Sequence, residues 1–185
     1  MKKLLIVVDY QVDFVDGALG FEGAELLDER IAAKIESYRE NGDAVVFTLD
    51  THHKNYLETQ EGKNLPIVHC VEGTPGHALY GKTATLLRDS DEVFRKNTFG
   101  STQLFNRLQQ AQKVADSVGK LPFESIELVG LVSSICVLSN AVLARTACPD
   151  VPIIVDAACT ASGDVEMNEK ALDVLENLQI SVINR

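Results

Sequence analysis

Short apolar runs alternate with amphipathic stretches along most of the chain. Six of these runs are almost continuously apolar and rich in β-branched residues, a pattern typical of strands buried on both faces of a parallel sheet. The pattern predicts strands at residues 3–9, 44–50, 92–96, 125–130, 152–157 and 180–185.

Longer stretches between these runs repeat their apolar residues at helical spacing. At the start of the chain, Leu27, Ile31 and Ile35 fall on one helical face, and Asn41-Gly42 supplies residues that commonly end a helix. Further along, Ser101-Thr102 offers hydroxyl side chains suited to a helix N-cap. We therefore predict helices at residues 24–40, 101–118, 134–147 and 165–178.

This regular alternation of strand and helix predicts one α/β domain spanning residues 1–185. We expect a three-layer sandwich around an open, mainly parallel six-stranded sheet. Residues 51–82 are the exception, because they are long, polar and only weakly periodic. A connection of that length is usually functional or disordered.

Composition narrows the class of protein. A length of 185 residues suits a single domain, and the net charge of −10 argues against a nucleic-acid or anionic-membrane partner. The first apolar run stops at Asp9, which is too short for a signal peptide or a spanning helix. The cysteines have no CxxC spacing and are interpreted as reduced thiols of a cytoplasmic protein: Cys70, Cys136, Cys148 and Cys159.

Reactive residues follow four of the predicted strands. The first strand ends at Asp9, the second at Asp50 and the third at Lys96, and the fourth leads into Cys136. Ligands of open parallel sheets bind at the carboxyl ends of the strands, so these four side chains are expected to meet at one edge.

Cys136 has two interpretations. A free cysteine is most often a small buried packing residue. Here it falls in the first turn of a predicted helix, where backbone N–H groups and the helix dipole stabilise a thiolate and lower its pKa. Asp9 would then exchange the proton, and the Lys96 cation would keep both anions charged. The combination predicts a cysteine nucleophile.

The segment 48–70 concentrates side chains that bind metals. Carboxylates and imidazoles in this arrangement suit Zn, Fe or Mn, with open positions for water or substrate. A polar surface loop with chance histidines is the alternative. The candidate side chains are Asp50, His52, His53, Glu58, Glu61 and His69.

Five motifs together resemble the isochorismatase-like cysteine hydrolases, most closely the nicotinamidase/pyrazinamidase branch. The resemblance runs nearly end to end and implies the fold of that family, with a Rossmann-like strand order. It is carried by "VVDYQVDF" (7–14), "LDTHH" (49–53), "HCVEGTPG" (69–76), "FRKNTFGS" (94–101) and "GLVSSICV" (130–137).

The resemblance implies a catalytic triad of Asp9, Lys96 and Cys136, with hydrolysis of a small amide through a thioester. It also implies a cis peptide bond between Leu131 and Val132, and an oxyanion hole formed by the backbone N–H groups of Val132 and Cys136. Phe14 matches the position that packs on the substrate ring. Residues Gln11 and Leu131 are further candidates for contact with the substrate.

In nicotinamidases a divalent metal holds the pyridine nitrogen, and no organic cofactor is implied. Asp50, His52 and His69 match three ligands of that metal. The fourth ligand has two candidates, Glu58 and Glu61, according to which branch of the family supplies the spacing, and we prefer Glu61. His53 is expected to point away from the metal.

One feature departs from the nicotinamidase pattern. The aromatic residue often found shortly before the last metal histidine is replaced by Pro66 and Ile67, so one wall of the ring site must be missing or come from elsewhere.

Three alternatives stay open: a metal-free N-carbamoyl or ureido amidase, a thiol-based binding or redox-sensing protein, and a metallohydrolase in which Cys136 is structural. For the leading interpretation we expect a small-molecule amide as substrate and a homo-oligomer.

Overall fold

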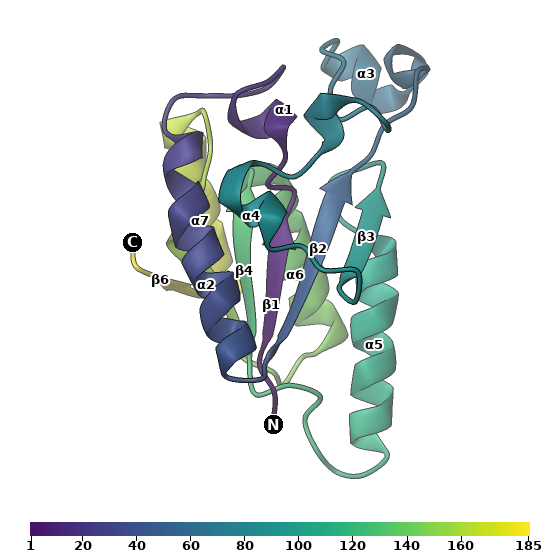
Figure 1. Ribbon diagram of the computed structural model, residues 1–185. Coiled ribbons are helices and arrows are strands. Elements are labelled where there is room, and N and C mark those ends of the chain that lie inside the picture. The colour runs from purple at the N-terminus through teal and green to yellow at the C-terminus, as the bar shows by residue number, and fades with distance from the viewer.

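The computed structural model describes residues 1–185, which form one open sheet covered by helices on both faces (Figure 1). The sheet has six strands in the order β3-β2-β1-β4-β5-β6, and all five neighbouring pairs are parallel. The predicted α/β fold is confirmed. The strands are β1 (Leu4–Val8), β2 (Ala44–Asp50), β3 (Glu92–Lys96), β4 (Ile126–Leu131), β5 (Ile153–Ala161) and β6 (Ser181–Ile183).

The helices complete two outer layers. On one face the longest helix is α2 (Asp28–Glu40), preceded by the short α1 (Val12–Val15) and the 3₁₀ turn η1 (Ala24–Leu27). The opposite face is covered by α5 (Thr102–Asp116), α6 (Leu138–Ala147) and α7 (Val165–Asn177).

Side-chain alternation along the central strands separates two cores. In β1, Leu4, Ile6 and Val8 pack toward the helices α5 to α7, whereas Leu5 and Val7 pack toward α2. All five β1 residues are buried, which explains why the run is apolar at every position and not only at alternate ones.

Most predicted boundaries lie within a few residues of the observed ones. The largest differences are at β5, which extends four residues past the predicted end at residue 157, and at residues 134–147, which begin as a π-helical turn, η4 (Ser133–Val137). Register shifts where β4 pairs with β5, between Leu128 and Gly130, so β5 accommodates extra residues that the apolar pattern does not reveal.

The long connection after β2 is ordered. Its first part lies above the carboxyl ends of the strands, at the upper end in Figure 1, and its last part lies lower and packs against α2. It contains η2 (Tyr56–Glu58), α3 (Gln60–Asn64), η3 (Pro75–His77) and α4 (Gly81–Thr85). No helix in the protein has the length and apolar character needed to cross a bilayer.

Candidate active site

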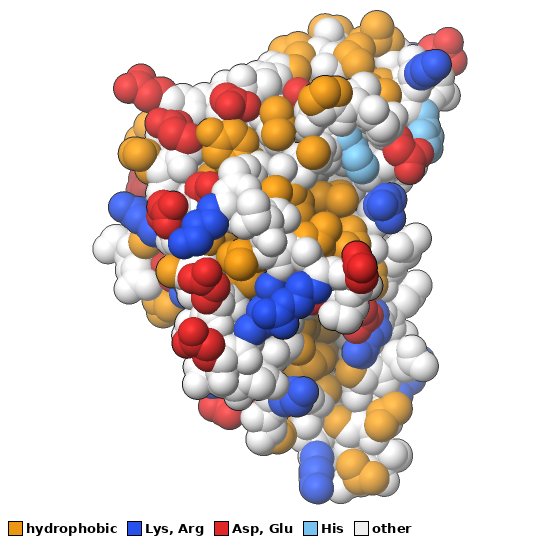
Figure 2. Space-filling view, viewed as in Figure 1, with side chains coloured by type: hydrophobic (Ala, Val, Ile, Leu, Met, Phe, Trp, Pro, Cys, Tyr) orange, Lys and Arg blue, Asp and Glu red, His pale blue; other side chains and the backbone are white.

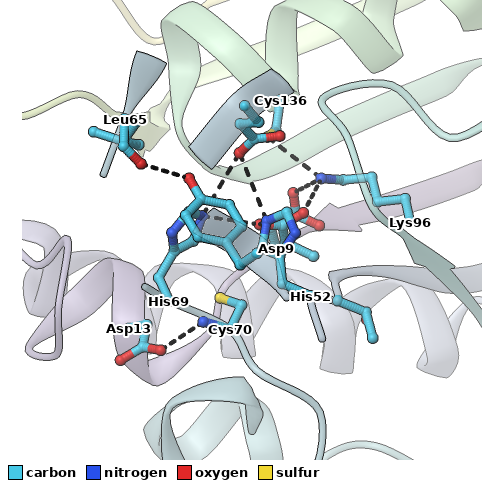
Figure 3. A network of polar contacts seen from close by, with 12 residues as sticks. Asp9, Asp13, His52, Leu65, His69, Cys70, Lys96 and Cys136 are labelled. Atoms are coloured by element: carbon cyan, nitrogen blue, oxygen red, sulfur yellow. Dashed lines mark hydrogen bonds and ion pairs between the residues drawn. The ribbon is translucent and has the colours of Figure 1, made fainter. Parts of the chain in front are cut away.

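Three side chains that follow different strands meet at the carboxyl edge of the sheet. We call Asp9, Lys96 and Cys136 the thiol cluster. The Lys96 ammonium lies 2.6 Å from Asp9 Oδ2 and 3.4 Å from Cys136 Sγ. All three residues are buried, and Figure 3 shows Lys96 reaching toward the site from its own strand. The expected convergence of strand ends therefore occurs.

Backbone geometry fixes where the Asp9 carboxylate points. Asp9 has a φ of 43°, in the left-handed region that non-glycine residues seldom adopt. Its N–H donates to the Thr48 carbonyl at 3.2 Å, and the Thr48 hydroxyl donates to Asp9 Oδ1 at 2.7 Å. Thr48 thus holds the carboxylate from the neighbouring strand, leaving Oδ2 for Lys96.

Burial controls the protonation of this cluster. It raises the pKa of Asp9, and the Lys96 charge opposes that rise without cancelling it. Burial opposes the charge on Lys96, but Asp9, Cys136 and Asp50 hold the lysine pKa above its usual value, so the ammonium persists.

The thiol itself behaves differently from the sequence-based expectation. Burial, followed by the negative charge of Asp9, raises the pKa of Cys136 well above its usual value, although Lys96 acts in the lowering direction. The prediction of a depressed pKa is therefore wrong for the free protein, because a helix start cannot offset complete burial beside carboxylates. Ionisation of the thiol therefore requires a nearby proton acceptor, and the Asp9 carboxylate shares the Lys96 ammonium with it.

A tight turn delivers Cys136 to the cluster. Gly130 has a φ of 109°, and a Cβ atom there would lie 2.0 Å from the Val8 carbonyl oxygen, so only glycine allows β4 to approach β1 here. The Leu131-Val132 peptide bond is cis, as the resemblance implied. The Val132 N–H donates to no other protein group, which leaves it available to a ligand.

One positioning residue, Asn140, was not predicted from the sequence. Asn140 is fully buried on α6, and its amide donates to the Cys136 carbonyl at 2.8 Å and to the Phe99 carbonyl at 3.1 Å. It also accepts from the Ser101 N–H at 3.0 Å. Asn140 thereby joins the turn that carries the thiol to the loop that follows Lys96. A lone buried amide in an apolar helix is the only sequence signal for it.

Four potential metal ligands lie beside the thiol cluster. Asp50, His52, Glu61 and His69, which we call the ligand cluster, each present an atom within 4.8 Å of the others. Asp50 Oδ2 lies 3.0 Å from His52 Nε2 and 3.3 Å from His69 Nε2. Asp50 also approaches the thiol cluster, since its Oδ1 atom lies 3.3 Å from the Lys96 ammonium.

The chemistry of the ligand cluster fits a divalent cation. His52 Nε2 is buried, and although Asp50 Oδ2 lies 3.0 Å away, the geometry gives this nitrogen no hydrogen bond, a costly condition that a metal ion bound by both groups would relieve. The Nδ1 atom of His69 lies 2.8 Å from the Ile67 carbonyl, so Nδ1–H donates there and Nε2 keeps its lone pair for a metal. Burial, followed by the nearby Asp50 charge, raises the pKa of Glu61.

The structure distinguishes the candidate metal ligands within residues 48–70 by their position. Glu61 lies in the ligand cluster, whereas Glu58 is exposed and outside it. His53 is also exposed and faces Glu72 at 3.8 Å.

Side chains that follow β1 position the ligand cluster. Gln11 is fully buried; its Nε2 donates to the Asp50 carbonyl at 2.9 Å and to the His77 carbonyl at 2.8 Å, while its Oε1 accepts from the Asp50 N–H at 2.7 Å. Asp13 accepts from the Cys70 N–H at 2.6 Å, next to His69 (Figure 3). These contacts tie two ligands to one short segment.

A cavity of about 480 Å³ opens over Cys136. Phe14, predicted to contact the substrate ring, lines it, and so does Val132. Gln11 and Leu131 were predicted to contact the substrate as well, but neither lines the cavity: Gln11 binds the backbone around Asp50, and Leu131 is buried in the core beneath.

The aromatic wall missing from the sequence motif is supplied by distant segments. Pro66 and Ile67 are exposed and lie outside the cavity lining. Phe21 and Phe99 line it, and so does Leu65, which directly precedes Pro66. Phe99 lies within the motif "FRKNTFGS", but neither phenylalanine was predicted to line the cavity, because no spacing along the chain links residues 21 and 99 to one site.

Known proteins resemble this chain over most of its length. The model of the isochorismatase domain matches residues 3–185. A Bacillus subtilis (strain 168) protein described as uncharacterized isochorismatase family protein PncA is 33% identical over 153 residues, covering 77% of this chain and 78% of that one.

Solved structures share the fold. The pyrazinamidase/nicotinamidase of Streptococcus mutans UA159 superposes with a TM-score of 0.83 at 28% identity, covering 98% of this chain and all of the other. The pyrazinamidase of Pyrococcus horikoshii, solved in complex with zinc, superposes with a TM-score of 0.79 at 21% identity, covering both chains fully. By its match to the isochorismatase domain over residues 3–185 and by its 33% identity to the Bacillus subtilis protein, the chain belongs to the isochorismatase family.

Proposed function

We propose that the protein is a metal-assisted cysteine amidase that hydrolyses a small aromatic amide such as nicotinamide. The observation that carries the proposal is the contact between the thiol cluster and the ligand cluster, four of whose side chains line one cavity: Cys136, Asp50, Glu61 and His69. The nicotinamidase and pyrazinamidase structures that this chain resembles support the choice of amide.

The first half of the reaction forms a thioester. Asp9 accepts the Cys136 proton as the sulfur attacks the amide carbonyl, which leaves negative charge on the carbonyl oxygen. The unpaired Val132 N–H, with that of Cys136, would hold this oxygen. Asp9 then gives the proton to the leaving nitrogen, ammonia departs, and the acyl group stays on sulfur.

The second half restores the thiol. Asp9 takes a proton from water as the water oxygen attacks the thioester, and returns it to the departing sulfur, which releases a carboxylic acid. Throughout, the Lys96 ammonium stabilises the negative charge that moves between Asp9 and Cys136.

A divalent cation fits the ligand cluster, where Asp50, His52, Glu61 and His69 would hold it. When bound, it would act as a Lewis acid toward a ring nitrogen and so orient the substrate. The assembled ligands favour this function over a metal-free carbamoyl amidase, which has no use for a buried His52 Nε2 without a partner.

The test is ammonia release from nicotinamide by the zinc-loaded protein. We expect Cys136→Ala to lower kcat/KM by at least about 10⁴-fold, because it removes the nucleophile. The matched control is Cys159→Ala, which removes another buried thiol that belongs to neither cluster and does not line the cavity, and it should retain activity. Chelation should abolish ammonia release, and added Zn, Mn or Fe should restore it.

Two results would contradict the proposal. Full activity of folded Cys136→Ala would assign the chemistry to a metallohydrolase. Release that persists after complete removal of metal would favour the metal-free amidase.

A further inference from the structure

The cavity has two ends of different chemistry. Its deep end holds the reactive groups, with Cys136, Asp50 and His69 all less than one-tenth exposed. Its outer end is apolar. The residues there come from the segments that follow α1, β3 and β5 and from the turn η4: Leu19, Phe21, Phe99, Ile135 and Gly163. Figure 2 shows further hydrophobic side chains gathered at the end of the molecule that carries α1 and α3.

The cavity is larger than one aromatic ring requires. Its volume of about 480 Å³ lies in the range of pockets that enclose drug-sized ligands, whereas a single-ring carboxamide is far smaller. A small amide placed with its carbonyl against Cys136 would leave the outer end of the cavity unfilled.

The charges around the cavity disfavour larger substrates that carry a carboxylate. None of the 14 lining residues is a lysine or an arginine, and the two ionisable acids among them are Asp50 and Glu61. The Lys96 ammonium is already engaged by Asp9 and Asp50. A carboxylate on the substrate would therefore lie among half-exposed apolar side chains at the outer end, where it would lose part of its hydration without gaining a cationic partner.

We propose that the outer end is a subsite for an uncharged apolar group, and that the preferred substrates are neutral aromatic amides carrying such a group away from the carboxamide. This inference rests on the proposed function, because it assumes that the amide lies at Cys136. The apolar group would contact Phe21 and Phe99 and remove their surface from water.

One glycine sets the width of this subsite. A Cβ atom at Gly163 would lie 3.2 Å from both Cβ and Cγ of Phe21, tighter than an ordinary contact. Gly163→Ala would therefore add a methyl group to the cavity lining against Phe21, force Phe21 to shift, and change the shape of the outer end. The neighbouring Ser162→Ala is the matched control, since Ser162 does not line the cavity.

The experiment measures binding separately from turnover. Zinc-loaded Cys136→Ala is titrated calorimetrically with nicotinamide, 5-phenylnicotinamide and 5-carboxynicotinamide. We expect the phenyl compound to bind at least about tenfold more tightly than nicotinamide, since a buried ring removes substantial apolar area from water. The carboxyl compound should bind no more tightly than nicotinamide. Adding Gly163→Ala should reduce the phenyl preference, whereas Ser162→Ala should not.

Each result has a distinct meaning. A phenyl compound that binds no better than nicotinamide, or a carboxyl compound that binds better, would overturn the subsite. Preference for the phenyl compound together with no ammonia release by the wild-type protein would uphold the subsite and contradict the amidase. Hydrolysis of nicotinamide without phenyl preference would uphold the amidase and contradict the subsite.

Discussion

The thiol cluster and the ligand cluster touch, yet the chain builds them in different ways. Asp9, Lys96 and Cys136 each lie at or within a few residues of a strand end, so the register of the sheet sets their separation. Of the ligand cluster only Asp50 ends a strand, while the other three members belong to the long connection after β2: His52, Glu61 and His69.

Side-chain hydrogen bonds position the ligand cluster, whereas the strands of the sheet position the thiol cluster. Gln11 holds the backbone around Asp50 on both sides, and Asp13 holds the backbone next to His69. Tyr56 packs against both imidazoles, with ring centroids 4.6 Å from His52 and 5.0 Å from His69. Substitutions at these supports should therefore weaken metal binding before they disturb the thiol.

The largest expected effect is a loss of zinc affinity that distinguishes Glu61 from Glu58. Glu61→Ala should raise the zinc Kd by at least about 100-fold, because it deletes a direct ligand, a larger loss than removal of an outer partner usually causes. Glu58→Ala is the matched control and should bind zinc like the wild type, since Glu58 is exposed outside the cluster. Competition with a chromophoric chelator measures both constants, and equal losses in the two variants would contradict the assignment.

A smaller effect should follow from Gln11→Leu, which keeps the volume of the side chain and removes its hydrogen bonds. The Asp50 N–H and carbonyl lose their partners, so we expect the zinc Kd to rise by about 10- to 100-fold. The free energy of unfolding should fall by about 1–3 kcal/mol, measured by urea denaturation.

The matched control is Gln112→Leu, which alters a buried glutamine on α5, remote from the site. If Gln11→Leu lost stability but kept wild-type zinc affinity, Gln11 would be a core residue with no role in positioning the ligand.

The smallest expected effect is a shift in the pH dependence of activity, and it involves only the thiol cluster. The Thr48 hydrogen bond lowers the pKa of Asp9, so Thr48→Val should raise that pKa further above its ordinary value. Asp9 must be unprotonated to accept the thiol proton, and activity is therefore lost as the pH falls through its pKa. The acidic limb of the kcat/KM profile should move to higher pH by less than about one unit.

Zinc affinity of Thr48→Val should stay at the wild-type value, because Thr48 contacts neither imidazole. An acidic limb that does not move would remove Asp9 from the proton transfer that limits activity.

Sequence alone was sufficient for features that depend on strand periodicity. The strand runs and the helices between them predicted the parallel sheet, and the residues that end the strands predicted which side chains meet. Asp9, Asp50 and Lys96 could be placed together because parallel strands share a carboxyl edge. The π-helical start of the segment that carries Cys136 has no comparable periodic signal.

Features that depend on contacts between distant loops were not predictable. Phe21 and Phe99 reach the cavity from segments with no shared spacing, and Asn140 joins two loops through its amide. The raised pKa of Cys136 was missed because its burial depends on the whole fold. The cytoplasmic location and the homo-oligomer stay predictions.

The strand order also determines when, during synthesis, the chain can assemble the thiol cluster. β1 pairs with β2 on one side and with β4 on the other, so residues 4–8 lie beside residues 126–131. Residues 9–96 carry Asp9, Lys96 and the whole ligand cluster, whereas Cys136 follows β4. During synthesis from the N-terminus, the residues suited to metal binding therefore emerge before Cys136. The thiol cluster lacks its sulfur until β4 and η4 have been made and β4 has docked beside β1.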